Sequence, residues 1–482
     1  MSSTARLALL GAVLMASLLA VPPAFAAGQP GVQRLSFRAG PYHVGPGQNR
    51  ILFAPTAQKP QVDGYIVGIR PNLRHADGSI PRTNKIMFHH AVWANLAGKD
   101  ATMGGPERFF AAGEEKTDLS LPKGYGYAYE ASDPWVLNYM IHNLVNRADD
   151  VYITYDIDFV PATSPAAASI KPARPVWMDV ENGKLYPVFD VFRGAGRKGK
   201  FTYPTQDPAA YAGRPRRPNR WRVDRDSVLI NTAGHLHAGG LWNDLYVTRK
   251  GKRARLFRSV AKYFEPLGPV SWDLAMTVTP QNYRVGLKKD DVLSTTVTYE
   301  SKRASWYESM GIMVSWLADA GPSKDPFRQK VDVKGKTTHG HLPENNVHGG
   351  KDIDADDPAD VASGAFSSNI AITNFGYLPK KRMGDRTPLV RRGKSIKFTS
   401  TDATRDIYHS VTSCRLPCNK STGIGYPIAN GPVEFDSGQL GFGGPPTPDR
   451  NTWSTSKRLK PGTYAYFCRI HPSMRGAFRV KK

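Results

Sequence analysis

The chain has 482 residues, 45 glycines, 38 prolines, three cysteines and a formal charge of +24. On a loose prior of about 150 residues per domain, this length corresponds to three domains. Beyond the first 26 residues no segment is apolar for long enough to cross a bilayer as a helix. The sequence also shows no heptad pattern and no internal repeat, which excludes a coiled-coil or repeat protein.

The N-terminus has the composition of a secretory signal. A short start with one basic residue, Arg6, precedes an apolar stretch from Leu7 to Val21, and Ala24-Phe-Ala26 forms an A-x-A cleavage site. We therefore expect residues 1–26 to be a signal peptide and the mature protein to be secreted or extracytoplasmic.

Strand-like alternation dominates the chain, and helical periodicity is scarce. Apolar residues from Val151 to Phe159 alternate with polar ones, as expected for a half-buried strand. The segments 294–299 and 395–399 show the same pattern, and the many glycines and prolines supply turns between short strands. The sequence therefore predicts an all-β protein built from sandwiches.

Two changes of composition mark domain boundaries. The Pro- and Ala-rich stretch 161–173 separates a first sandwich, residues 27–160, from a second, residues 161–320. Residues 321–364 are polar and charged, and we expect an extended linker there. A C-terminal domain, residues 365–482, follows it.

Five histidines of the first two domains fall in short motifs. His89 and His90 are adjacent, His142 follows an apolar strand, and His235 and His237 form an H-x-H. An H-x-H on a strand projects both imidazoles from one face, where they can chelate a metal. Adjacent residues point to opposite faces, so His89 and His90 can share a metal only at a strand end or a bulge.

In this order, with Met310 in the segment Glu308-Ser-Met310, the motifs resemble the copper type II monooxygenases, the family of peptidylglycine and dopamine β-monooxygenases. The resemblance covers residues 31–320 and implies two jelly-roll-like β-sandwiches that carry two mononuclear coppers. One copper would be held by His89, His90 and His142. The other, which meets oxygen, would be held by His235, His237 and Met310, the catalytic set of an enzyme.

The chain also departs from that family. Residues 31–320 contain no cysteine, although family members carry several disulfides, and Ala233 stands where peptidylglycine enzymes have a substrate-binding arginine. A peptidylglycine substrate is therefore not expected. Zinc suits a three-histidine site as well as copper does, and a copper motif elsewhere in the chain favours copper.

The linker holds three more histidines, His339, His341 and His348. Weak surface binding of copper and no function at all both remain open for them.

The C-terminal segment carries the most specific motif. Cys468-Arg-Ile-His471-Pro-Ser-Met474 follows an alternating strand, and His409 lies upstream. Two histidines and one cysteine in a trigonal plane, with a weak axial methionine, are the ligands of a blue-copper electron-transfer site. The spacing resembles the cupredoxin family of amicyanin- and plastocyanin-like proteins. The resemblance implies a Greek-key β-sandwich after the two jelly-roll-like ones, with type 1 copper on His409, Cys468, His471 and Met474.

The other two cysteines, Cys414 and Cys418, form a C-x3-C pair near His409. In an exported protein we expect them to form a disulfide.

A basic stretch, Arg214 to Arg222, contains arginines interleaved with a tryptophan, a composition that can bind nucleic acid. For an exported protein a solvated face attracted to anionic cell-envelope polymers or an acidic redox partner is favoured. We expect no nucleic-acid partner.

Together these patterns predict an exported copper redox protein. A blue-copper domain would receive electrons from a redox protein or small reductant, and a monooxygenase-like module would hydroxylate a C–H bond with O2. The alternatives are a non-enzymatic electron carrier and a copper-binding protein.

Overall fold

The structure is a computed structural model, and it describes residues 31–482 apart from 56–57, 84, 185–186, 212–218, 265–271, 303–304, 320, 343–361, 379–385, 403–406, 415–432, 443–449 and 472–473. Strands make up almost all of its regular structure, and the only helices in the described residues are two short 3-10 turns, η1 (Pro165–Ser169) and η2 (Pro208–Tyr211). This confirms the all-β prediction. No helix in the described part of the chain has the length and apolar character of a membrane span.

The first sandwich pairs two antiparallel sheets, β1-β9-β3-β7 and β2-β8-β4-β5. Its strands are β1 (Gln33–Val44), β2 (Leu52–Pro55), β3 (Gly64–Arg74), β4 (Ile86–Lys99), β5 (Pro106–Ala112), β6 (Leu119–Ser120), β7 (Tyr125–Tyr129), β8 (Trp135–Asn143) and β9 (Asp149–Pro161). The alternation in β9 is the one that the sequence predicts, because its apolar residues from Val151 to Phe159 are buried. Each such side chain contributes about 1.5–3 kcal/mol of burial free energy.

The second sandwich continues from the first, because β10 pairs in parallel with β7. One of its sheets contains β10, β21 and β14, and the other contains β16, β15, β19 and β12. Its strands are β10 (Lys171–Asp179), β11 (Phe189–Val191), β12 (Lys200–Tyr203), β13 (Arg220–Arg222), β14 (Ser227–Leu236), β15 (Gly240–Arg249), β16 (Lys252–Tyr263), β17 (Leu274–Val278), β18 (Val285–Leu287), β19 (Val292–Glu300), β20 (Trp306–Ser309), β21 (Gly311–Ala318) and β22 (Lys336–Thr337).

The C-terminal domain is a smaller sandwich of two mixed sheets, β23-β26-β32-β31-β28-β29 and β25-β24-β27-β30. Its strands are β23 (Ser363–Phe366), β24 (Asn369–Thr373), β25 (Gly376–Leu378), β26 (Thr387–Arg391), β27 (Lys397–Ser400), β28 (Thr412–Cys414), β29 (Val433–Asp436), β30 (Thr452–Ser454), β31 (Gly462–Phe467) and β32 (Arg475–Lys481). Parallel pairing of β26 with β32 and of β24 with β27 requires crossover connections.

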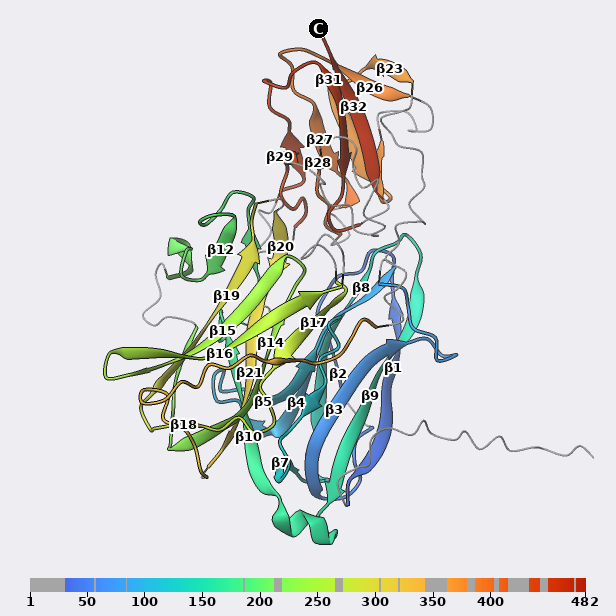
Figure 1. Cartoon of the computed structure of the whole chain (residues 1–482). Helices are drawn as coiled ribbons and strands as arrows, with labels where there is room; N and C mark the ends of the chain where they lie inside the picture. Colours follow the sequence, from blue (N-terminus) through green and yellow to red (C-terminus); the bar gives the residue numbers. More distant parts are fainter. Residues whose placement is uncertain are drawn as a thin grey trace, which may run out of the picture.

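Figure 1 shows how the three sandwiches are arranged. The first (blue to teal) and second (green to yellow) lie side by side, and the C-terminal domain (orange to red) stands on the end that they share.

The first part of the expected linker differs from an extended connector. Val331 is buried in the core of the second sandwich, and β22 pairs with β17. Phe327 and Val331 of this segment explain the difference, because these apolar side chains pack in or against the core of the second sandwich. Charged residues surround them in the sequence, so the segment reads as polar.

Candidate copper centres

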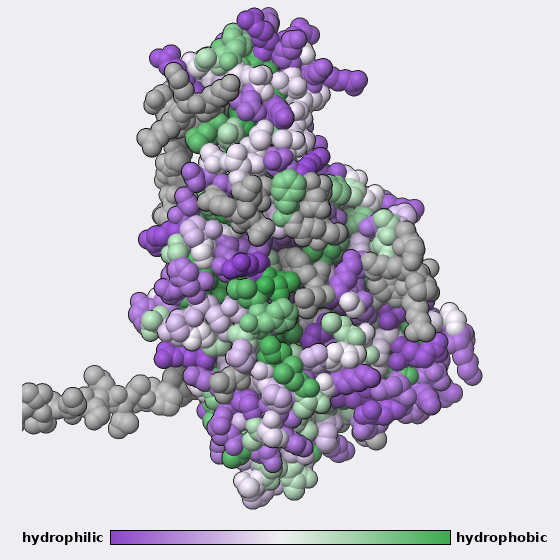
Figure 2. Space-filling view, turned by 180° about the vertical axis from the view of Figure 1, so that it is seen from behind, coloured by the Kyte–Doolittle hydropathy of each residue, from purple (hydrophilic) through white to green (hydrophobic). Residues whose placement is uncertain are grey.

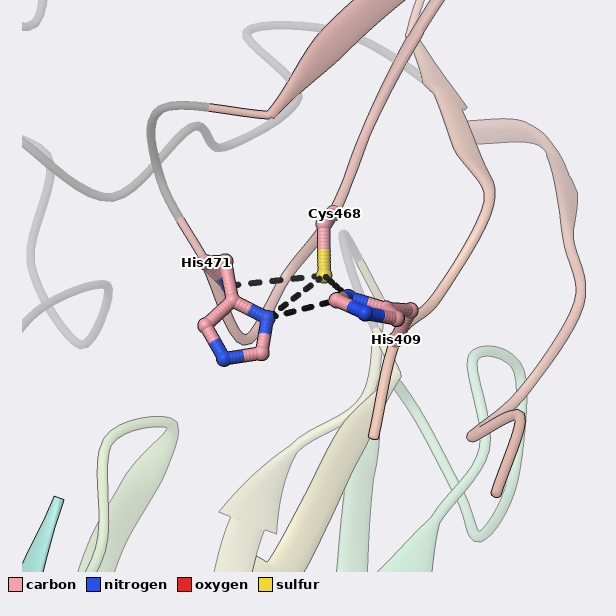
Figure 3. A group of neighbouring side chains, drawn as sticks. All are labelled: His409, Cys468 and His471. Atoms are coloured by element: carbon pink, nitrogen blue, oxygen red, sulfur yellow. Dashed lines mark hydrogen bonds between the residues drawn. The ribbon is translucent and has the colours of Figure 1, made fainter. Parts of the chain in front are cut away.

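Three of the four blue-copper ligands predicted from the sequence, His409, Cys468 and His471, converge in the C-terminal domain (Figure 3). His409 forms a bridge with Leu440 just before β28, Cys468 follows β31, and His471 lies three residues further on. The Nδ1 atoms of His409 and His471 are 3.1 Å apart, and Cys468 Sγ lies 4.0 Å and 3.7 Å from them. Among the described residues, this is the one group of three or more His, Cys, Asp or Glu whose ligand atoms all lie within 4.8 Å of one another.

These separations fit a metal ion at the centre of the triangle. With metal–nitrogen bonds of about 2.0 Å and metal–sulfur bonds of about 2.3 Å, trigonal ligands lie about 3.5–3.7 Å apart. Met474, the predicted axial ligand, is buried in the same apolar cluster as Cys468. Backbone hydrogen bonds from Cys468 N to Met474 O and from Met474 N to His471 O close the loop. The site is therefore a type 1 copper-like site with soft and imidazole ligands.

The surroundings of Cys468 favour the thiolate that copper requires. Burial alone would raise the pKa of the thiol, but hydrogen bonding and charge from His409 hold that pKa below its ordinary value. The backbone N–H groups of Ser410, Ile470 and His471 donate to Sγ at 3.3–3.4 Å. Burial also lowers the pKa of His471 well below its usual range, which leaves a neutral imidazole with a free lone pair.

Asp402 orients His409. Its Oδ2 lies 2.9 Å from His409 Nε2, and both side chains are buried. A carboxylate on the outer nitrogen fixes the tautomer that leaves Nδ1 free for the metal.

Asp402→Asn should therefore weaken copper binding by about 10–100-fold. The neutral amide would hold the His409 ring less firmly than the carboxylate does, and the imidazole would be a weaker ligand for the metal. Competition with a chelator measures this affinity, with Asp224→Asn, a change at an exposed ion pair of the second sandwich, as control. Unchanged affinity in the Asp402 variant would show that the contact has no role in holding the metal.

The five motif histidines of the first two sandwiches, His89, His90, His142, His235 and His237, form one cluster. A bulge in the pairing of β4 with β8 falls between Phe88 and His90, so His89 is the additional residue. This is the bulge that adjacent histidines need to turn toward one another, and their Nδ1 atoms lie 3.3 Å apart. Ring centroids of His89 and His237 are 4.6 Å apart, those of His235 and His237 are 5.2 Å apart, and those of His89 and His142 are 6.3 Å apart.

The five histidines line two different cavities, and the groups that they form in these cavities differ from the two predicted ligand sets. His89, His142 and His237 line a cavity of about 80 Å³ that faces the C-terminal domain. His90, His235 and Met310 line a second cavity of about 160 Å³ between the two sandwiches. Each predicted set thus has members on both sides, and copper ligation by these residues stays a prediction.

Orphaned nitrogens in the cluster fit a metal. His142 Nε2, His235 Nε2 and both ring nitrogens of His237 are buried and have no hydrogen-bond partner among the described residues. Burial lowers the pKa of His237 and His90 well below the usual range, and it lowers the pKa of His142 to about 3. Buried neutral imidazoles with free lone pairs are the form in which histidine binds metals.

Two carboxylates, the buried Glu115 and the part-buried Glu308, support the cluster. Glu115 Oε1 lies 2.8 Å from His235 Nδ1, and this contact leaves His235 Nε2 available for a metal. Asp402 plays the same part for His409, but it contacts Nε2 and leaves Nδ1 available. Glu308 Oε2 lies 3.7 Å from His89 Nε2. Burial opposes ionisation of both carboxyls, but the histidine partners hold the pKa of each below its ordinary value.

Glu308 also joins the three domains. Its carboxylate accepts hydrogen bonds from Asn49 of the first sandwich at 3.1 Å and from Gln439 of the C-terminal domain at 3.2 Å. Its backbone has φ 53°, a left-handed conformation that costs a non-glycine residue about 1–3 kcal/mol. Strain of this kind persists where surrounding contacts over-determine a position.

The blue-copper site meets the histidine cluster at this junction. The rings of His471 and His142 have centroids 5.7 Å apart at an interplanar angle of 78°, and both residues are buried. Tyr307 donates a hydrogen bond to Asp436 across the interface, and the Arg469 guanidinium lies 5.0 Å from the centroid of the Trp306 ring. The two centres are therefore held next to each other by contacts on more than one side.

The other candidate site residues singled out in the sequence are the linker histidines and the C-x3-C pair. His339 Nε2 contacts the carbonyl oxygen of Glu115, and His341 Nδ1 lies 2.8 Å from Asp273 Oδ2. His348, Cys418 and the signal segment lie outside the described residues, as does the side chain of Cys414. The predicted disulfide therefore stays a prediction.

Sequence reasoning did not single out Asp402 or Glu115, and it noted Glu308 only as a neighbour of Met310. Asp402 and Glu115 are acidic residues in polar segments, and nothing in their sequence context distinguishes them from solvated carboxylates. A charged residue that is buried can be told from an exposed one only once the fold shows which residue it pairs with.

Comparisons with known proteins give distant structural matches. No family model and no curated protein matches the chain. A purple cupredoxin from Nitrosopumilus maritimus is 18% identical over 24% of this chain and 100% of its own, with a TM-score of 0.16. A copper-containing nitrite reductase from Thermus scotoductus SA-01 is 17% identical over 53% of this chain and 55% of its own, with a TM-score of 0.17. The major capsid protein P2 of bacteriophage PM2 is 8% identical over 60% and 98%, with a TM-score of 0.25. Values this low establish no family membership.

Proposed function

We propose that the chain is a copper redox protein in which the C-terminal blue-copper site passes electrons to a copper centre in the two N-terminal sandwiches, where O2 is used to hydroxylate a C–H bond. The contact between the His471 and His142 rings carries this proposal. A ligand of one centre faces a histidine of the other across a buried interface, and electron transfer is fastest over such short separations.

The reaction balances with two electrons. R–H, O2, two electrons and two protons give R–OH and water, so an external one-electron donor must act twice. We propose a redox protein or a small reductant as this donor. Copper, when bound, supplies the reversible one-electron chemistry and the reaction with O2.

The residues of the chain divide the remaining work. Cys468 and His471 would provide the exit for electrons from the blue-copper site, and His142 and His89 would help to hold the copper that accepts them on the other side of the interface. The Glu308 carboxylate orients the His89 ring. Its hydrogen bond from Gln439 stabilises the interface with the C-terminal domain. Met310 lies at the second cavity, and its thioether favours Cu(I), the state that reacts with O2.

Export to an extracytoplasmic compartment is part of the proposal and rests on residues 1–26 alone. The net charge of +24 supports an acidic redox partner or an anionic polymer of the cell envelope.

Metal analysis of two proteins tests the copper assignment. The intact chain should hold about three copper ions, one blue and two in the sandwiches. Substituting both His235 and His237 by Ala should reduce the copper content and leave the blue absorption unchanged, because the blue site lies in a separate core. His43→Ala, at an exposed position of β1, is the matched control. A single copper in the intact protein would exclude the second centre and leave an electron carrier.

A further inference from the structure

The cavity that His90, His235 and Met310 line lies between facing sheets of the two sandwiches. One wall comes from β4, β5 and β8, and the other from β10, β14 and β21. Strand alternation directs every second residue into it: His90, Val92 and Ala94 from β4, and Ile312, Val314 and Trp316 from β21. The rear face of the molecule shows an apolar strip near its middle (Figure 2).

The walls are mainly apolar, and most of their charges are neutralised. Val92, Phe110, Trp177, Ile312, Val314 and Trp316 contribute apolar surface. Arg108 is paired with Asp100 at 2.7 Å, and Glu115 is paired with His235. Burial raises the pKa of Asp179 to about 7, so this carboxyl is largely protonated below neutral pH. A charged ligand would lose its hydration here with little compensation.

The cavity has a polar position and a reactive end. Asn231 Nδ2 is buried in its lining without a hydrogen-bond partner, so it can donate to a ligand. His235 and Met310 lie on the same wall, and His235 Nε2 is also without a partner. A molecule in the cavity would therefore contact residues of the proposed oxygen-reactive centre.

We infer that this cavity binds the molecule to be oxidised, and that it is a small neutral compound with an apolar body the size of one aromatic ring and a single hydrogen-bond acceptor. This inference rests on the proposed function. Its size follows from the volume of about 160 Å³, since an apolar cavity of about 150 Å³ accommodates benzene. The acceptor follows from Asn231.

Binding of 4-fluorophenol to the intact protein, followed by ¹⁹F NMR line broadening, tests the inference without any turnover. The wild type should bind 4-fluorophenol and not 4-fluorobenzoate, which has the same ring with a negative charge. Ala233→Leu places a larger side chain in the cavity, and it should weaken binding at least about tenfold, or about 1.4 kcal/mol. Ala76→Leu, in the exposed loop after β3, should bind as the wild type does.

The outcomes separate this inference from the proposed function. Absence of binding, equal binding of the benzoate, or unchanged binding in Ala233→Leu would overturn the inference, even if the blue site is reoxidised by O2. Because Ala233→Leu could disturb folding, Asn231→Ala provides a second variant. It enlarges the cavity, and it should weaken binding of 4-fluorophenol more than binding of fluorobenzene, which has no hydroxyl. Binding as inferred, in a protein that consumes no O2, would support the cavity assignment and contradict the proposed oxidation.

Discussion

Cys468→Ser should abolish the intense red-region absorption of the copper-loaded, oxidised protein. That absorption arises from charge transfer from a thiolate to Cu(II), and a hydroxyl oxygen cannot replace the covalent sulfur bond. The loss should be complete, because Cys468 is the only cysteine in the triangle of donors. Optical spectra of both proteins at equal copper concentration measure it.

Met474→Leu is the matched control for this experiment. Leucine has a similar size and keeps the apolar cluster around Cys468 filled. The colour should remain, and the reduction potential should rise, because a weak donor that stabilises Cu(II) is removed. A blue band that survives in Cys468→Ser would overturn the assignment of the type 1 site.

His142→Phe should slow the transfer of electrons from the blue site by about tenfold or more, equivalent to a barrier increase of about 1.4 kcal/mol. Phenylalanine keeps an aromatic ring in the buried position but has no nitrogen for a metal. The position of the blue band should not change, because His142 belongs to β8 of the first sandwich. Stopped-flow absorption after mixing the reduced protein with O2 measures the rate.

His75→Phe is the control for this variant, since His75 lies in the loop after β3 and contacts Ser79 and Asp149 instead of the cluster. A rate in His142→Phe equal to that of the wild type would show that electrons do not pass through this contact.

The sequence predicts the individual strands and the blue site well because both depend on local patterns. Alternation from Val151 to Phe159 reports burial directly, and β9 forms there. The C-x2-H-x2-M spacing places three ligands on one loop, and only His409 must come from elsewhere in the domain. Short-range spacing is enough to specify such a site.

The arrangement of the other histidines depends on contacts between strands that are distant in the sequence. His89 approaches His90 because β4 has a bulge, and it approaches His237 because the two sandwiches pack together. A one-residue change in register exchanges the faces of a strand, so motif order alone does not determine which histidines share a cavity. The contact of His142 with His471 depends on the docking of a third domain.

The most direct test of the central claim is the fate of the blue absorption when fully reduced, copper-loaded protein is mixed with O2 in the absence of any other electron acceptor. We expect the blue band to return rapidly in the intact wild type, because in the proposed function O2 would oxidise the copper held by the two sandwiches, and that copper would then accept electrons from the blue site through His471 and His142. A blue site that stays reduced in a protein containing its full complement of copper would contradict the account.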